Sequence, residues 1–92
     1  MLAAAREALN NGQVAVAPVS GFHHAGYEQA CGFCTFNGLI VAARALLSEG
    51  LASRVGILDC DMHFGDGTAQ IIRFLGLEAS IKHYTAGEEF HR

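Results

Sequence analysis

Short apolar runs and helical patterns alternate along this chain, and this alternation constrains its fold more than any other feature. Each apolar run has the length of one strand, and the segments between the runs repeat apolar residues at helical spacing. Strands that alternate with helices predict a parallel sheet with right-handed crossovers. We therefore predict an α/β fold of the three-layer α/β/α type, with a short parallel sheet of about three strands and flanking helices. The expected helices cover residues 2–10, 36–49 and 67–76, and the expected strands cover residues 13–19, 54–59 and 79–84.

The chain is short and rich in apolar residues. Its 92 residues support one domain at most, and a composition of 51% hydrophobic and 16% charged residues is typical of a globular chain. So much apolar material predicts burial against another subunit or against a further part of the protein. We therefore expect a homo-oligomer that forms through exposed apolar sheet and helix surfaces. The net charge of −3 argues against nucleic-acid binding.

We expect neither a signal peptide nor a membrane segment in this sequence. The N-terminal stretch "MLAAAREALNNG" has charged residues inside its apolar part, which is typical of an amphipathic helix. No apolar run approaches the roughly 20 residues that cross a bilayer. Among three cysteines, Cys31 and Cys34 form a single C-x-x-C, which is weak evidence for zinc or redox chemistry and more typical of small thiols in a reducing compartment. We expect a cytoplasmic protein.

The stretch "DCDMHFGDG" follows directly on the apolar run "VGIL" and concentrates three carboxylates and a histidine. In extended geometry Asp59, Asp61 and His63 project to the same side, so that a carboxylate and an imidazole can converge on one cation. These ligand types suit zinc, iron(II) or manganese better than calcium. A calcium loop that starts at Asp59 is excluded, because Phe64 stands at the glycine position and Gln70 at the bidentate glutamate position. A polar loop with a capping aspartate remains the alternative.

A second polar feature, His23 and His24, lies in a glycine-rich loop after the expected strand 13–19. Ligands of parallel sheets bind at the carboxyl ends of strands, where both polar features fall. Adjacent histidines there can act as general acid and base if carboxylates orient their far nitrogens, and Asp59 and Asp66 are candidates for this. An incidental pair of surface histidines is the alternative.

The segments "GFHHAGYEQACGFCTFNGLIVAA" and "RVGILDCDMHFGDGTAQII" together resemble the zinc-dependent histone deacetylase superfamily, with its acetylpolyamine amidohydrolases and acetoin-utilisation-type proteins. The family signatures are a G-x-H-H-A-like segment, then G-F-C-x-x-N, then D-x-D-x-H-H-G-[DN]-G-T. The resemblance runs over residues 14–84, about the middle quarter of a family domain. It implies a partial arginase/deacetylase fold.

The resemblance also implies a role for each matching residue. Asp61 and His63 match two of the three zinc ligands. In the family, zinc and a histidine activate the water that attacks the amide carbonyl. The remaining catalytic matches are the acid/base histidines His23 and His24, with Asp59 supporting the first and Asp66 the second.

Two further matches concern the substrate and a second ion. Gly32 and Phe33 match positions that line the narrow channel for an acylated lysine or amine substrate. Family members also bind a structural monovalent cation such as potassium near the zinc loop, largely through backbone carbonyls.

The sequence departs from the family pattern at several points. Phe64 stands where the family usually has a second histidine, and "VSGFHHA" replaces the commoner Pro-Pro-Gly-His-His-Ala. The third zinc ligand, an aspartate, and the transition-state tyrosine come from later strands of the family domain and have no counterpart in residues 1–92. We therefore expect a fragment or truncated homologue of a deacetylase that hydrolyses acetyl-lysine or acetylpolyamine-type amides and is inactive as an isolated chain. The alternative is a non-catalytic oligomeric binding module that retains a segment of the deacetylase fold.

Overall fold

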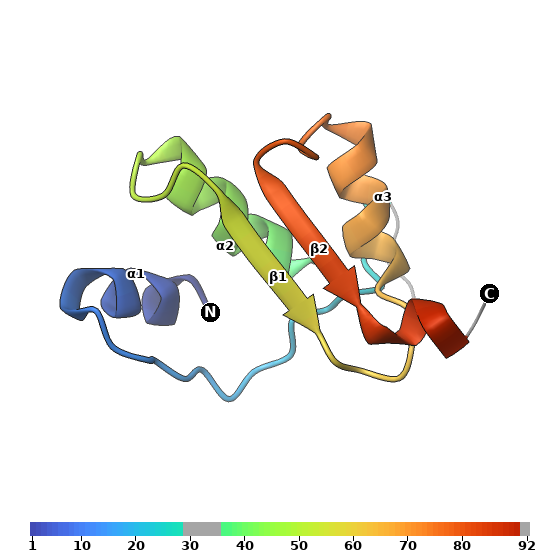
Figure 1. The fold of residues 1–92 in the computed structure, drawn as a ribbon, viewed down its shortest axis with the longest axis horizontal. Helices are drawn as coiled ribbons and strands as arrows, with labels where there is room; N and C mark the ends of the chain where they lie inside the picture. The colour runs from blue at the N-terminus through green and yellow to red at the C-terminus, as the bar shows by residue number, and fades with distance from the viewer. Residues whose placement is uncertain (29–35, 91–92) are drawn as a thin grey trace.

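The computed structural model describes residues 1–28 and 36–90 of the chain and, for residues 89 and 90, the backbone alone. Figure 1 shows the helices and strands of this part. In chain order they are α1 (Leu2–Asn11), α2 (Gly38–Ser48), β1 (Val55–Asp59), α3 (Asp66–Phe74), β2 (Ile81–Thr85) and the short 3₁₀ helix η1 (Ala86–Phe90).

The two strands form a parallel sheet. β1 pairs with β2 in a register that runs from Val55 opposite Ile81 to Asp59 opposite Thr85. Since α3 connects the two strands, β1, α3 and β2 form one crossover unit of the kind that parallel pairing requires. The α/β class and the parallel sheet are therefore confirmed. Asp59 is the last residue of β1, so the strand delivers its carboxylate to the edge of the sheet.

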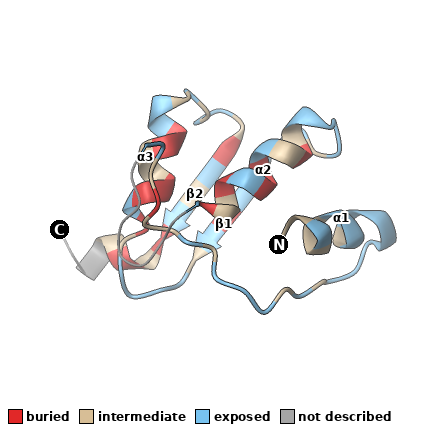
Figure 2. Ribbon diagram, turned by 180° about the vertical axis from the view of Figure 1, so that it is seen from behind, coloured by how far each residue is buried: buried red, intermediate tan, exposed pale blue. Residues whose placement is uncertain are grey.

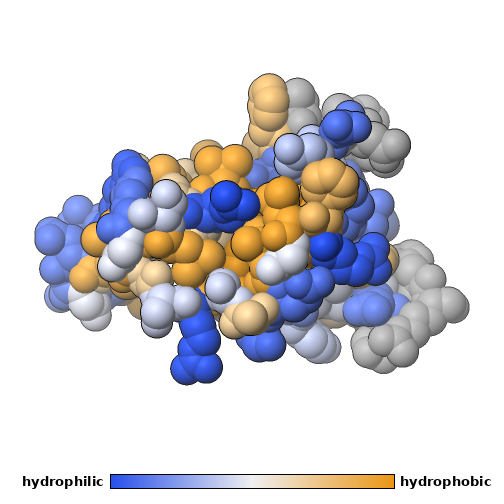
Figure 3. Space-filling model, turned by 90° about the horizontal axis from the view of Figure 1, so that it is seen from above, coloured by the Kyte–Doolittle hydropathy of each residue, from blue (hydrophilic) through white to orange (hydrophobic). Residues whose placement is uncertain are grey.

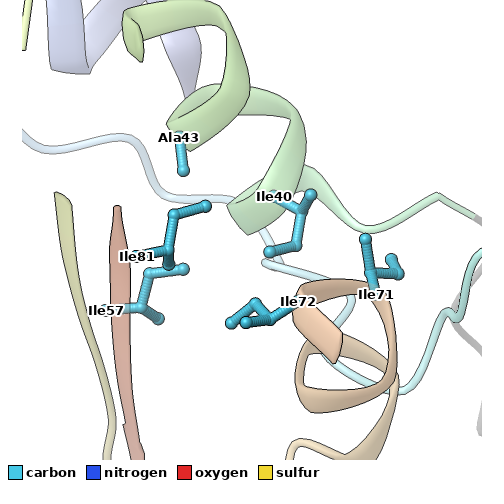
Figure 4. Close-up of a cluster of buried hydrophobic side chains, with 6 residues drawn as sticks. All are labelled: Ile40, Ala43, Ile57, Ile71, Ile72 and Ile81. Atoms are coloured by element: carbon cyan, nitrogen blue, oxygen red, sulfur yellow. The ribbon is translucent and has the colours of Figure 1, made fainter. Parts of the chain in front are cut away.

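A small isoleucine-rich core joins this sheet to α2 and α3. Figure 4 shows the core side chains between the sheet and the two helices, which both lie on the same face. Alternation along the strands explains why: Ile57 and Ile81 point toward the helices, and their neighbours in the chain point away. The cluster consists of Ile40, Ala43, Ile57, Ile71, Ile72 and Ile81, none more than 8% exposed.

The opposite face of the sheet is uncovered within the described part of the chain. Leu58 and Tyr84, which point to that face, are 71% and 55% exposed. Gly56 and Lys82 beside them are also exposed. The expectation of helices on both faces of the sheet is thus wrong for the described residues, which form two layers.

The strand predicted over residues 13–19 is also wrong. The segment is extended, but the strand pairing in the described part of the chain joins only β1 and β2, so the sheet has two strands and not three. Figure 1 shows the segment running apart from β1, and Val14 and Val16 are 92% and 81% exposed. Strands are stabilised by ladder hydrogen bonds and cross-strand side-chain contacts, and this segment has neither.

The first helix contributes little to the core. Figure 2 shows α1 without a buried residue, although it lies beside α2. An exposed ion pair links them, in which Arg6 Nε donates to Glu49 Oε1 over 3.1 Å. Exposed pairs of this kind add little to the stability of a fold. The part of the fold that positions polar groups is therefore the unit formed by α2, β1, α3 and β2.

Candidate active site

The loop before α2 turns sharply just ahead of its two histidines. Phe22 has a φ of 57°, in the left-handed region that bulky residues rarely adopt. The turn is closed by local hydrogen bonds: the Phe22 N–H donates to Ser20 Oγ over 3.0 Å, and the Ala25 N–H donates to the Phe22 carbonyl over 3.1 Å. Such backbone strain persists only where the surrounding contacts hold it.

Those contacts come from a buried polar cluster under the histidine loop. Asn37, the N-cap of α2, accepts a hydrogen bond at Oδ1 from the Ile40 N–H over 3.1 Å. Its Nδ2 donates to the Ala25 carbonyl over 3.1 Å and to Thr68 Oγ1 over 2.9 Å. Asn37 is 5% exposed and Thr68 and Ala25 are fully buried, so each lost bond would leave a polar group without water.

The backbone of α3 completes this clamp. The Thr68 N–H donates to the His23 carbonyl over 3.1 Å, so that a free helix N–H binds the loop. At Gly67 a β-carbon would lie 2.4 Å from the Ala25 carbonyl oxygen, so only glycine allows the loop and the helix to approach this closely. The first turn of α3 and the cap of α2 therefore hold the two histidines together.

Each histidine of the loop faces one carboxylate. His23 Nδ1 lies 2.5 Å from Asp59 Oδ2, and His24 Nδ1 lies 2.5 Å from Asp66 Oδ1. The two imidazole rings are neighbours, with centroids 4.1 Å apart. A carboxylate that accepts a hydrogen bond from Nδ1–H leaves the lone pair of the neutral ring on Nε2. The structure thus brings together the pairs that the resemblance implies, while the catalytic roles of these four residues stay a prediction.

Asp59 is held from two sides. Its Oδ2 atom faces His23, and its Oδ1 atom accepts a hydrogen bond from the Asp61 N–H over 3.1 Å. Asp66 lies at the start of α3 but does not cap the helix. Gly65 is the N-cap, without a side-chain cap, and Asp66 is the first residue of the helix. Its carboxylate is paired with His24 instead.

Asp61 and His63 converge in the loop after β1. Asp61 Oδ1 lies 2.9 Å from His63 Nδ1 and also accepts from the His63 backbone N–H over 2.7 Å. These two contacts from His63, the backbone one first, hold the pKa of the Asp61 carboxyl below its usual value. Both side chains are exposed. Two ligands of a tetrahedral zinc lie about 3.3 Å apart, given bonds of about 2.0–2.1 Å, so the pair has suitable atoms at a suitable separation.

The described residues provide too few ligands for a catalytic zinc ion. Within residues 1–28 and 36–90, no group of three or more histidine, cysteine, aspartate or glutamate side chains could hold a metal ion. A catalytic zinc takes three protein ligands. The donor types present suit the ion, but they make up two thirds of a ligand set.

The His23–Asp59 pair, His24 and the Asp61–His63 pair line one cavity of about 750 Å³. The His24 and His63 rings approach each other there, with centroids 6.3 Å apart. Apolar side chains also line the cavity. The lining residues that bear on the chemistry are His23, His24, Asp59, Asp61 and His63, and the apolar ones include Val19, Phe22, Leu39 and Leu58. An apolar cavity with a few convergent polar groups is typical of a small-molecule site.

Three residues near this cavity have a function in the structure that pattern reasoning from the sequence missed. Asn37 and Thr68 stand inside the quoted motifs, but only their contacts identify them as the clamp of the histidine loop. His83 lies on β2 beside the His23–Asp59 pair. Its signal in the sequence is weak, a histidine at an inward position of an otherwise apolar strand face. The expected channel residues Gly32 and Phe33, and the Cys31–Cys34 motif, lie outside the described residues.

Comparison with known proteins agrees with the resemblance. The sequence model of the family described as "Histone deacetylase domain" matches residues 1–80. The chain is 45% identical to human histone deacetylase 7 over 67 residues, which is 73% of this chain and 7% of that protein. It is 49% identical over 49 residues to acetylpolyamine amidohydrolase 2 of Pseudomonas aeruginosa, 53% of this chain and 14% of that protein. It is also 44% identical to an uncharacterised protein of Picosynechococcus, over 75% of this chain and 23% of that protein.

These relatives are much longer than the chain, which spans between 7% and 23% of their lengths. No solved structure matches the chain. In the described residues, every helix is too short or too polar to cross a membrane.

Proposed function

The chain belongs to the histone deacetylase family, and from this premise we propose that it is a segment of a zinc-dependent deacylase. The substrate class is an N-acylated amine, such as acetyl-lysine or an acetylpolyamine. The segment supplies the acid/base histidines and part of the metal ligand set, and as an isolated 92-residue chain it does not hydrolyse amides.

One observation carries this proposal: two histidines, each paired with a carboxylate, line one cavity with the Asp61–His63 pair. Amide hydrolysis needs a base that takes a proton from water and an acid that gives a proton to the leaving amine. Each histidine has Nδ1 at a carboxylate, which leaves Nε2 to accept or return a proton in the cavity. The oxygen of water then bonds to the carbonyl carbon, the C–N bond breaks, and the protonated nitrogen departs as the amine.

For the metal, we propose that Asp61 and His63 are two zinc ligands and that the third protein ligand comes from outside the described residues. When bound, zinc supplies a Lewis acid that polarises the amide carbonyl and favours ionisation of water. The donor types and the 2.9 Å between Asp61 Oδ1 and His63 Nδ1 support this. A structural potassium ion near this loop stays a prediction of the resemblance, and a cytoplasmic location stays a prediction from the sequence.

Calorimetric titration of the 92-residue chain with zinc tests the metal part of the proposal. We expect weak binding of one zinc per chain, lost in His63→Ala and in Asp61→Asn. Cys60→Ser, which changes the exposed thiol next to the candidate ligand Asp61, is the matched control and should bind as the parent chain does. Binding that persists in both ligand variants would overturn the assignment.

The bare face of the sheet favours a second proposal, that the chain associates with copies of itself. Leu58 and Tyr84 on that face are mostly exposed, and Figure 3 shows further apolar surface gathered across the middle of another face. Large exposed apolar patches mark interaction surfaces. A non-catalytic oligomeric binding module would have this property without any metal. Light scattering after size exclusion should give a multimer for the parent chain and a monomer for Tyr84→Lys, and a parent monomer would contradict self-association.

A further inference from the structure

His83 lies on the inner face of β2, where the side chains otherwise belong to the core or to the site. It stands opposite Ile57 of β1, between the buried residues Ile81 and Thr85 of the same face. Its Nε2 atom is buried and has no hydrogen-bond partner, and it is the one such side-chain nitrogen or oxygen among the described residues. A buried polar atom without a partner costs stability, which raises the question of what the histidine does there.

The surroundings of Nε2 point toward the His23–Asp59 pair. A β-carbon at Gly65 would lie 2.7 Å from Asp59 Oδ2, 3.3 Å from His23 Nδ1 and 3.4 Å from His83 Nε2. All three atoms therefore border the same glycine. On the strands, His83 is a diagonal neighbour of Asp59, a distance that a long side chain can span.

Burial favours a neutral His83 ring. Burial lowers the pKa of His83 from its ordinary value of 6.5, and His23 lowers it further, while Asp59 and Glu88 act in the opposite direction. A neutral imidazole carries one N–H donor. The Asp59 Oδ2 atom has two acceptor positions, and the contact with His23 uses one of them.

We propose that His83 is a positioning residue of the His23–Asp59 pair. After a small rotation of its ring, its Nε2–H donates to the free acceptor position of Asp59 Oδ2. The resulting chain, His83–Asp59–His23, holds the carboxylate against Nδ1 of His23 and so keeps the proton on that nitrogen. The consequence for catalysis, a free Nε2 on His23, rests on the proposed function, whereas the contact itself does not.

The direct test is a long-range ¹H–¹⁵N spectrum of the histidine rings in the 92-residue chain, recorded where the rings are neutral. We expect His83 to be protonated on Nε2 and His23 on Nδ1. A His83 ring with its proton on Nδ1 would overturn the proposal without the need for any variant.

Two variants then test the positioning role. His83→Leu removes the donor, and we expect His23 to change from the Nδ1 form to a mixture of both neutral tautomers. His83→Gln keeps an N–H donor, and we expect it to restore the Nδ1 form. The His24–Asp66 pair serves as the control within the same molecule, because His83 does not border it, and its tautomer should be the same in all three proteins.

An unchanged His23 tautomer in His83→Leu would overturn the proposal, as would a change in His24 of the same size, which indicates a general loss of structure. None of these readouts needs turnover or metal. A chain that fails as a deacylase would contradict the proposed function and leave these spectra as they are, so the two failures are distinguishable.

Discussion

The two His–Asp pairs have the same contact distance and very different surroundings. In each, the histidine Nδ1 lies 2.5 Å from a carboxylate oxygen. The side chains of His23 and Asp59 are 14% and 9% exposed, whereas those of His24 and Asp66 are 24% and 55% exposed. Water and salt screen the second pair far more than the first. Pairs with the same contact distance can therefore contribute differently to the stability of the fold.

The difference follows from the elements that carry the carboxylates. Asp59 ends a strand that is packed against two helices, and its second oxygen is bound by the loop that follows. Asp66 starts α3 at the surface, where a carboxylate also interacts well with the helix dipole. We infer that the surrounding fold holds the His23–Asp59 pair in place, whereas the His24–Asp66 pair can change its position. Such freedom suits a group that meets solvent and substrate.

The largest expected effect comes from removing each carboxylate charge in turn. We expect Asp59→Asn to lower the free energy of unfolding by about 1–3 kcal/mol, since both carboxylate oxygens accept hydrogen bonds and the amide NH2 that replaces one of them faces an N–H donor. The matched variant Asp66→Asn should cost less than about 1 kcal/mol, as exposed pairs do. Urea unfolding of the three proteins measures both. Equal losses would contradict the distinction between the pairs.

A second expected effect concerns the clamp that both pairs share. Thr68→Val keeps the shape of the side chain but removes the hydroxyl that accepts from Asn37 Nδ2. We expect a loss of about 1–2 kcal/mol in urea unfolding, because the amide is left with an unmet hydrogen bond in a buried position. Thr68→Ser, which keeps the hydroxyl, is the control for the bond itself. If both variants unfold alike, the hydroxyl does not matter.

Beside the buried pair, His83 should also give the stability of the fold a pH dependence. Its pKa is lowered in the folded chain, so between that value and the ordinary 6.5 the unfolded chain binds more protons. The free energy of unfolding should then fall as the pH falls below about 6.5 and level off, for this group, below its folded pKa. Asp61, whose pKa is lowered from 3.8, titrates below this window.

Urea unfolding of the parent chain and of His83→Leu at several pH values checks this sign. We expect the slope between about pH 7 and the folded pKa of His83 to be smaller in the variant. A variant that loses stability with acid as steeply as the parent chain would refute the assignment of this slope to His83.

The smallest expected effect is the response to salt. At about 1 M salt the screening length falls to about 3 Å, so the cost of Asp66→Asn should shrink toward zero. The cost of Asp59→Asn should persist, because ions do not enter a buried pair. The measurement is urea unfolding of both variants and the parent chain at low and high salt. If the losses in free energy of unfolding shrink equally in both variants, the two pairs do not differ in their screening by solvent.

The parts of the fold that could be predicted from the sequence are those with local partners. The run "VGIL" and the helical patterns on either side of it predicted β1, α2 and α3 to within a few residues, because these elements pack on one another. Residues 13–19 have an equally strand-like composition, but they do not pair with either strand of the described chain. Composition indicates what a segment can become, and only pairing with a neighbouring strand makes it a strand.

In the site too, residues inside a motif could be predicted from the sequence, whereas residues identified only by their contacts could not. The resemblance paired His23 with Asp59 and His24 with Asp66, because motif residues have family counterparts. The clamp made by Asn37 and Thr68 and the position of His83 depend on contacts between distant segments, and no spacing in the sequence encodes them.

The central claim, that this chain carries working acid/base groups of a deacylase, is tested most directly in a complete family domain. In acetylpolyamine amidohydrolase 2 of Pseudomonas aeruginosa, the segment that corresponds to residues 20–80 would be replaced by that of this chain, and hydrolysis of an acetylpolyamine would be measured. We predict a chimera that hydrolyses this substrate and loses about 10²–10⁴-fold in rate with His24→Ala, the usual weight of a general acid or base. A folded, zinc-loaded chimera that is no faster than its His24→Ala variant would contradict the account.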